Sequence, residues 1–113
     1  MGIQSTVLAQ YQQILDRAAG QARNLPVPKE GWIRTARKAL GMSGAQLARR
    51  MGSSRAQVSQ FEKREAEGNL TIKTLERAAA ALGCRFVYAI VPESSAAELI
   101  SQRALDKARQ VVA

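Results

Sequence analysis

Histidine is absent from this sequence, and cysteine occurs only once, as Cys84. A chain with one cysteine cannot form an internal disulfide, and a chain without histidine lacks the most common general base and metal ligand. A zinc site would have to use carboxylates alone, which is unusual. We therefore expect no catalytic residue, no metal site and no cofactor, and we do not expect an enzyme.

Long apolar runs are also lacking. The longest, Phe86–Pro92, is far shorter than the roughly 18–20 residues that a membrane-spanning helix needs. The first residues do not join a basic segment to an apolar stretch, so no secretory signal is expected and the protein should be cytoplasmic. The length suits one small domain, which we place at residues 29–83, between an N-terminal helix and linker (1–28) and a C-terminal segment (84–113).

Acidic residues are scarce between Arg23 and Arg64, where ten basic residues face two acidic ones. This segment accounts for the whole net charge of +8, because the rest of the chain has seven residues of each sign. Such a concentration of positive charge is typical of a surface that binds a polyanion. The alternative is a solvated basic face without a function.

Apolar residues recur at helical spacing in several segments, and glycine or proline separates them. Three of the segments open with a capping box, at Ser43, Ser54 and Ser95. We expect the first helix to end near Gly20. The predicted helices cover residues 3–19, 31–40, 43–51, 54–65, 71–82 and 96–111.

One segment, residues 85–91, is β-branched and aromatic and is predicted to be a strand. A single strand leaves two unpaired edges, and both faces of this one are apolar. The simplest partner is the same strand of a second copy, which would make a two-fold homodimer. Pairing with a segment interpreted as coil, or with another protein, remains open. The predicted interface residues are Phe86, Val87, Tyr88, Ala89, Ile90 and Val91.

Residues 44–61 have the spacing of a helix-turn-helix. Ala48 lets two helices cross closely, Gly52 allows the turn between them, and Val58 buries the second helix against the first. Leu47 and Phe61 complete a small core. The alternative is an ordinary antiparallel helix pair. The predicted fold is a mainly α helix-turn-helix bundle with one added β-strand and terminal helices.

With Val58 and Phe61 inward, the opposite face of the 54–65 helix carries short polar, amide and basic side chains. Arginine can bind guanine with two hydrogen bonds and glutamine can bind adenine in the same way. We predict that this helix reads DNA bases in the major groove. The predicted base-reading residues are Arg55, Ala56, Gln57, Ser59 and Gln60.

Phosphate contacts should come from the residues that flank the reading helix. Arg37, Arg49 and Arg50 are further possibilities that could equally be solvated. Glu62 is the acidic exception and is expected to pair with an arginine or cap a backbone amide. The predicted phosphate-binding residues are Ser43, Lys63, Arg64, Asn69, Thr71, Lys73 and Arg34.

The stretch from Gln46 to Glu62 resembles the lambda-repressor-like, xenobiotic-response-element (XRE) class of bacterial and phage regulators, over about residues 31–83. The resemblance implies that Arg55, Ala56, Ser59 and Gln60 face base edges and that Ser43 and Lys63 lie near the DNA backbone. This chain departs from the class at Gly44, where glutamine is common, and at Ser53, where valine or isoleucine is favoured.

Gly31-Trp32-Ile33-Arg34 and Val87-Tyr88-Ala89-Ile90-Val91-Pro92 look like the family called mobile mystery protein A, a resemblance that covers nearly the whole chain. That family is typically encoded beside a Fic-domain protein. The resemblance implies an antitoxin-like role in which the protein represses its own operon. The homodimer on double-stranded DNA is the expectation from the strand and the reading helix. The alternative it implies is a protein-interaction module that binds the Fic partner. The usual inhibitory motif of Fic inhibitors is not met, because Leu99 follows Glu98.

Overall fold

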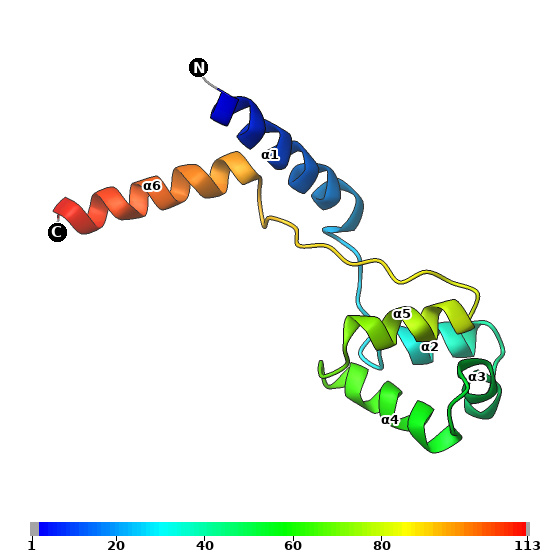
Figure 1. Ribbon diagram of the computed structural model, residues 1–113. Coiled ribbons are helices and arrows are strands. Elements are labelled where there is room, and N and C mark those ends of the chain that lie inside the picture. Colours follow the sequence, from blue (N-terminus) through cyan, green and yellow to red (C-terminus); the bar gives the residue numbers. More distant parts are fainter. Residues whose placement is uncertain (1–2, 113) are drawn as a thin grey trace. The chain divides into compact units, whose positions relative to one another are not determined.

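The computed structural model describes residues 3–112, and within them the chain forms six helices and no strand (Figure 1). The six predicted helices are therefore confirmed, with ends that differ by at most three residues. The helices are α1 (Ile3–Ala22), α2 (Trp32–Ala39), α3 (Gly44–Met51), α4 (Arg55–Ala66), α5 (Ile72–Ala81) and α6 (Ala96–Val112).

The chain divides into two compact units. The four-helix unit is Pro26–Val87 and holds α2 to α5. The terminal unit combines Met1–Leu25 with Tyr88–Ala113, so α1 and α6 contact each other within it. The boundary in the second half of the chain lies within the segment that we predicted to be a strand.

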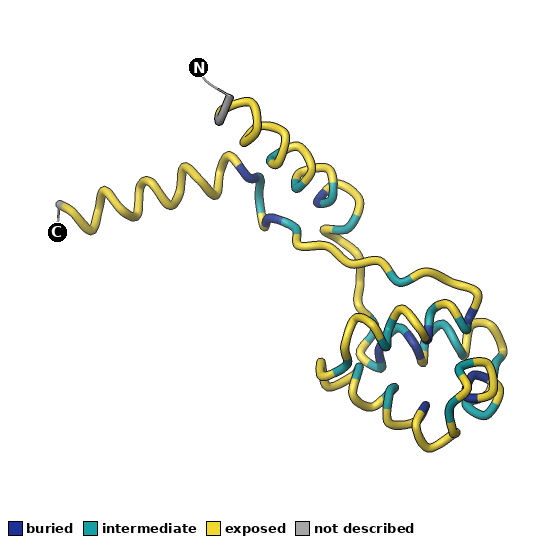
Figure 2. The backbone as a smooth tube through the Cα atoms, in the orientation of Figure 1, coloured by how far each residue is buried: buried dark blue, intermediate teal, exposed yellow. Residues whose placement is uncertain are grey.

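The core of the four-helix unit is small and draws on all four helices (Figure 2). Leu47 of α3 and Val58 of α4 are its largest fully buried side chains, at 0% and 1% exposure. Ala48 is also buried, as close crossing of α3 and α4 requires. The buried residues of this core are Ile33, Leu47, Ala48, Val58, Ala78 and Leu82.

The turn between α3 and α4 has the predicted chemistry. Gly52 has φ 65° and ψ 32°, the left-handed conformation that glycine adopts without steric cost. Ser54 then caps α4, because its Oγ accepts from Gln57 N (3.1 Å) while Gln57 Oε1 accepts from Ser54 N (2.9 Å). Ser43 and Gln46 form the same reciprocal pair at the start of α3. Both ends of the turn are thus set by local sequence.

The terminal unit has very little core. Of its described side chains, Ala19, Pro92 and Ala96 are buried, and they are small. Two long-range polar contacts join its halves: Arg23 donates to the carbonyl oxygens of Pro92 and Ser94, and Asp16 Oδ1 accepts from Ala96 N at 3.0 Å. Asp16 therefore serves as a cap for α6 from another helix.

Two predictions about local structure are wrong. Gly20 does not end α1, which continues to Ala22, because glycine inside a helix costs only about 1 kcal/mol relative to alanine. The strand predicted at 85–91 is not found in the described residues: residues 84–92 are neither helix nor strand. A strand forms only by hydrogen bonding to a neighbouring strand, and residues 3–112 of this single chain contain no such neighbour.

The third capping box forms only in part among the described contacts. Ser95 Oγ accepts from Glu98 N at 3.2 Å, as predicted, while the cap on Ala96 N comes from Asp16.

The turn at Gly68–Asn69 is confirmed, with φ 78° at Gly68 and a hydrogen bond from Asn69 N to Arg64 O of 2.8 Å.

Candidate nucleic-acid interface

The first two turns of α4 present an exposed surface that flanks and lies opposite the buried Val58. All the predicted base-reading residues lie there and all are solvent-exposed. Because Ser54 caps the helix, the chain enters α4 at a defined angle, and the positive end of the helix dipole points outward beside these side chains. The residues on this face are Arg55, Ala56, Gln57, Ser59 and Gln60.

Gln57 is partly committed to structure. Its Oε1 accepts from Ser54 N, which uses one of the two acceptor sites of that oxygen and fixes the orientation of the amide. Two-bond recognition of adenine needs both amide atoms and therefore suits Gln60 better.

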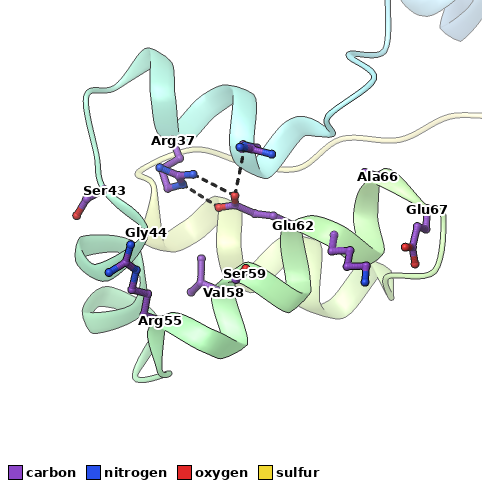
Figure 3. A pocket seen from close by; sticks show the side chains of 11 residues that line it. Arg37, Ser43, Gly44, Arg55, Val58, Ser59, Glu62, Ala66 and Glu67 are labelled. Atoms are coloured by element: carbon purple, nitrogen blue, oxygen red, sulfur yellow. Dashed lines mark hydrogen bonds and ion pairs between the residues drawn. The ribbon is translucent and has the colours of Figure 1, made fainter.

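A concave surface of about 670 Å³ adjoins this face and is formed by α2, the start of α3 and α4 (Figure 3). Figure 3 shows Arg55 at the edge near Gly44, with Glu62 deeper in the hollow. Arg34, Lys63 and Ser43, three of the predicted phosphate-binding residues, are in its lining. Gly44 has no side chain, so the first turn of α3 is open to a ligand here. The structure thus brings together cations from two helices and a capped helix start.

Glu62 lies at the centre of an ion-pair cluster that joins α2 to α4. Arg37 Nε and Nη2 donate to its two carboxylate oxygens at 2.8 and 3.0 Å, a two-bond arrangement. Arg34 Nε lies 3.9 Å from Glu62 Oε1. The prediction that Glu62 pairs with an arginine is confirmed.

Arg37 is a structural residue that the sequence analysis placed among the possible phosphate contacts. Its Nη1 also donates to Met42 O at 3.0 Å, so it joins α2, α4 and the loop before α3. The hydrogen bond to Glu62 raises the pKa of the Arg37 guanidinium above its ordinary value, against an opposing effect of burial. The sequence signal for this role was Glu62, an isolated acidic residue on a basic surface, which needs a basic partner such as Arg37.

The other predicted phosphate residues lie outside the concave surface. Arg64, Asn69 and Lys73 are exposed, at the end of α4, in the following turn and at the start of α5. Thr71 caps α5, since its Oγ1 accepts from Thr74 N at 3.2 Å. Arg50, a further possibility, instead donates to Ala81 O at 3.4 Å.

Glu65 has a role that the sequence analysis missed. Its carboxylate accepts from Trp32 N (2.6 Å) and Ile33 N (2.9 Å), and so caps α2 from the far end of α4. The residue before α2 is Gly31, which has no side chain to do this. The sequence did contain a signal for this role. No serine, threonine, aspartate or asparagine precedes α2, so its cap has to come from another part of the chain.

Two negative findings apply to the part of the chain that the structure describes. Residues 3–112 hold no group of three or more cysteine, aspartate or glutamate side chains placed to bind a metal ion. None of the six helices combines the length and apolar character needed to cross a membrane.

A capped, exposed helix packed across a second short helix, beside a basic hollow, defines a helix-turn-helix domain. Residues 33–88 match the family described as helix-turn-helix, which spans most of the four-helix unit. Comparisons with curated proteins and with solved structures give no match. The family match supports DNA binding of the XRE-like class. It does not extend to the mobile mystery protein A family, which stays a prediction.

Proposed function

We propose that this protein is a sequence-specific transcriptional regulator that binds DNA as a homodimer and represses its own operon. The exposed N-terminal face of α4, beside a concave basic surface, is the observation that supports DNA reading. Major-groove recognition by a helix uses side chains near its N-terminus, where Arg55, Ser59 and Gln60 lie.

The mechanism divides the contacts into two groups. Residues of the reading face contact base edges and supply sequence preference. Arg34, Lys63 and the open first turn of α3 line the adjoining hollow and would hold phosphates on either side of the groove. Arg37 and Glu62 contact each other and keep α2 and α4 in place while contributing no net charge.

Two copies would read two half-sites about one helical turn of DNA apart, as helix-turn-helix dimers do. We propose residues 86–91 as a dimer contact, because Val87, Tyr88 and Ile90 are exposed in the single chain. Autorepression rests on the resemblance to the mobile mystery protein A family.

The decisive experiment compares binding to the DNA upstream of the gene with binding to random DNA of equal length, across salt concentrations. We expect a preference of about 10³ or more for the upstream DNA, together with a steep loss of affinity as salt rises. Equal, weak and salt-sensitive binding to both DNAs would mean that the basic surface attracts any DNA without regard to sequence, and it would contradict the proposal.

A second candidate is an antitoxin-like module that binds a Fic-domain partner. The exposed apolar side chains of α1 and α6 favour it, since such surfaces mark protein contacts. The test is coexpression with the product of the neighbouring gene. A stable complex that a charged substitution in α1 or α6 disrupts would support this function, and independent elution of the two proteins would contradict it.

A further inference from the structure

An apolar groove of about 500 Å³ runs between α1 and α6 in the terminal unit. Leu8, Tyr11 and Leu15 line it from α1, and Leu99 and Ile100 line it from α6. No part of the described chain fills it. A hollow of this kind between two helices accepts apolar side chains from a third helix, as in helical bundles.

Helix α6 covers only part of the apolar stripe of α1. Tyr11 and Ile14 are 68% and 67% exposed, and from Ala97 to Val111 every residue of α6 is exposed. Most of the stability of a helix in a protein comes from tertiary packing of its apolar face rather than from helix propensity. The described core of this unit is too small to supply that support. The fold therefore needs a further surface against α1 and α6.

The charge distribution indicates which partner fits. The four-helix unit has twelve basic and five acidic residues, so two copies of it repel each other. The terminal unit has five basic and four acidic residues and is nearly neutral. Within α1, Asp16 and Arg17 are the only charged residues, alongside five glutamines. This near-neutral surface does not attract DNA or an anionic membrane, and it lets two like copies approach.

We propose that the α1–α6 groove is the docking site of a second copy of this chain, whose own α1 and α6 pack against it in a two-fold arrangement. The need for two copies rests on the proposed function, because two half-sites require two reading helices. The proposal adds a helical interface to the contact suggested at residues 86–91. Two such units would join into a four-helix core that neither has alone.

The test measures association of the full chain by sedimentation equilibrium. The wild type should be a dimer of twice 12.3 kDa. Ile14→Glu and Tyr11→Glu should weaken the dimer by at least about tenfold, since each buries a charge without a partner. Leu105→Glu is the matched control: it lies on the face of α6 opposite the groove, adds the same charge and should leave the dimer intact.

Hydrogen exchange on the wild type avoids any effect of substitutions on folding. Amides of α1 and α6 should be protected above the dimerisation concentration and exchange rapidly below it. A wild-type monomer at concentrations that saturate DNA would overturn the proposal. So would a dimer that Ile90→Glu abolishes while Ile14→Glu and Tyr11→Glu preserve it.

The DNA readout separates this proposal from the function on which it rests. A dimer disrupted by Ile14→Glu that shows no preference for any DNA would contradict the regulator and support the interface. A monomer that still prefers one DNA sequence would contradict the interface and support DNA reading.

Discussion

At the scale of single residues, the proposed function divides the side chains on α4 between base recognition and attraction to the DNA backbone. Arg55 stands at the start of the reading face and Lys63 follows two turns later, and both side chains line the basic hollow. An arginine at a base edge recognises one sequence, and a lysine beside a phosphate attracts every sequence equally. The two residues have the same charge and should therefore be separable by experiment.

We predict that Arg55→Ala weakens binding to the specific DNA by about 1–3 kcal/mol and leaves random DNA nearly unchanged. Lys63→Ala should weaken both DNAs alike and reduce the slope of affinity against salt by about one. Titrations of both variants on both DNAs at several salt concentrations measure this. Equal losses on specific and random DNA for Arg55→Ala would remove it from the base-reading residues.

Glu62 is expected to matter for stability. Its side chain and that of Arg37 are only 11% and 15% exposed, so Glu62→Gln leaves a largely buried guanidinium without its counter-charge. We expect a loss of about 1–3 kcal/mol in the free energy of unfolding, measured by urea denaturation. Glu67→Gln is the control, because Glu67 is exposed at the end of the same helix. A loss no larger than that of the control would show that the ion pair is not stabilising.

The pH dependence of this contribution follows from the raised pKa of Arg37. A basic group whose pKa is higher in the folded than in the unfolded state contributes its full stabilisation when the pH is below the unfolded-state pKa. That contribution is lost only as the pH rises through the folded-state pKa. The ordinary pKa of an arginine already lies far above neutral, so the raised pKa of Arg37 gives no change in stability through the neutral range.

At the scale of the helices, α2 and α4 are joined by a cap that spans much of the domain. Gly31 has φ 88°, and a Cβ there would lie 2.7 Å from the Glu65 carboxyl carbon. The Glu65 side chain could swing away, but it would then release the two amides that it caps. The cap on α2 therefore depends on both the glycine at position 31 and the carboxylate at position 65.

A double-mutant cycle tests this coupling. Gly31→Ala should destabilise the fold both by its positive φ and by displacing Glu65, and Glu65→Ala should cost about 1 kcal/mol through the lost cap. The combined variant should lose less than the two separate losses together, by about 0.5 kcal/mol or more. Urea unfolding of the four proteins gives the coupling energy. Strict additivity would mean that the two positions act independently.

Helix caps and turns could be predicted from the sequence where interactions between neighbouring residues determine them. The capping boxes at Ser43 and Ser54 and the glycine turn at Gly52 act within a few residues, so they could be recognised without the fold. Glu65 could not be recognised, because its partners lie 32 and 33 residues away. The 85–91 segment was misassigned because a strand depends on a neighbouring strand that residue preferences do not reveal.

On the scale of the whole molecule, the proposed function depends on two copies. The four-helix unit carries nearly all the net positive charge and the terminal unit carries most of the exposed large apolar side chains, so the proposed reading helix and the proposed α1–α6 interface lie in different units. This separation allows association to be disrupted without touching the reading helix.

The spacing of the two half-sites offers a prediction at this scale. Inserting about 5 base pairs between them places the half-sites on opposite faces of the DNA, so one dimer can no longer contact both. We expect affinity to fall to that of a single half-site and to recover in part when the insertion reaches about 10 base pairs. Gel-shift titrations of the three DNAs measure this. Equal affinity for all three would contradict binding as a two-fold dimer.

The sequence by itself determined the six helices, the helix-turn-helix and the basic segment, because helical periodicity, capping and charge are written in neighbouring residues. The tertiary structure alone decided that Arg37 holds Glu62, that Glu65 caps α2, and that α1 and α6 contact each other while leaving their apolar faces exposed. These features join residues far apart in the chain, and only the packing of the helices brings such residues within bonding distance.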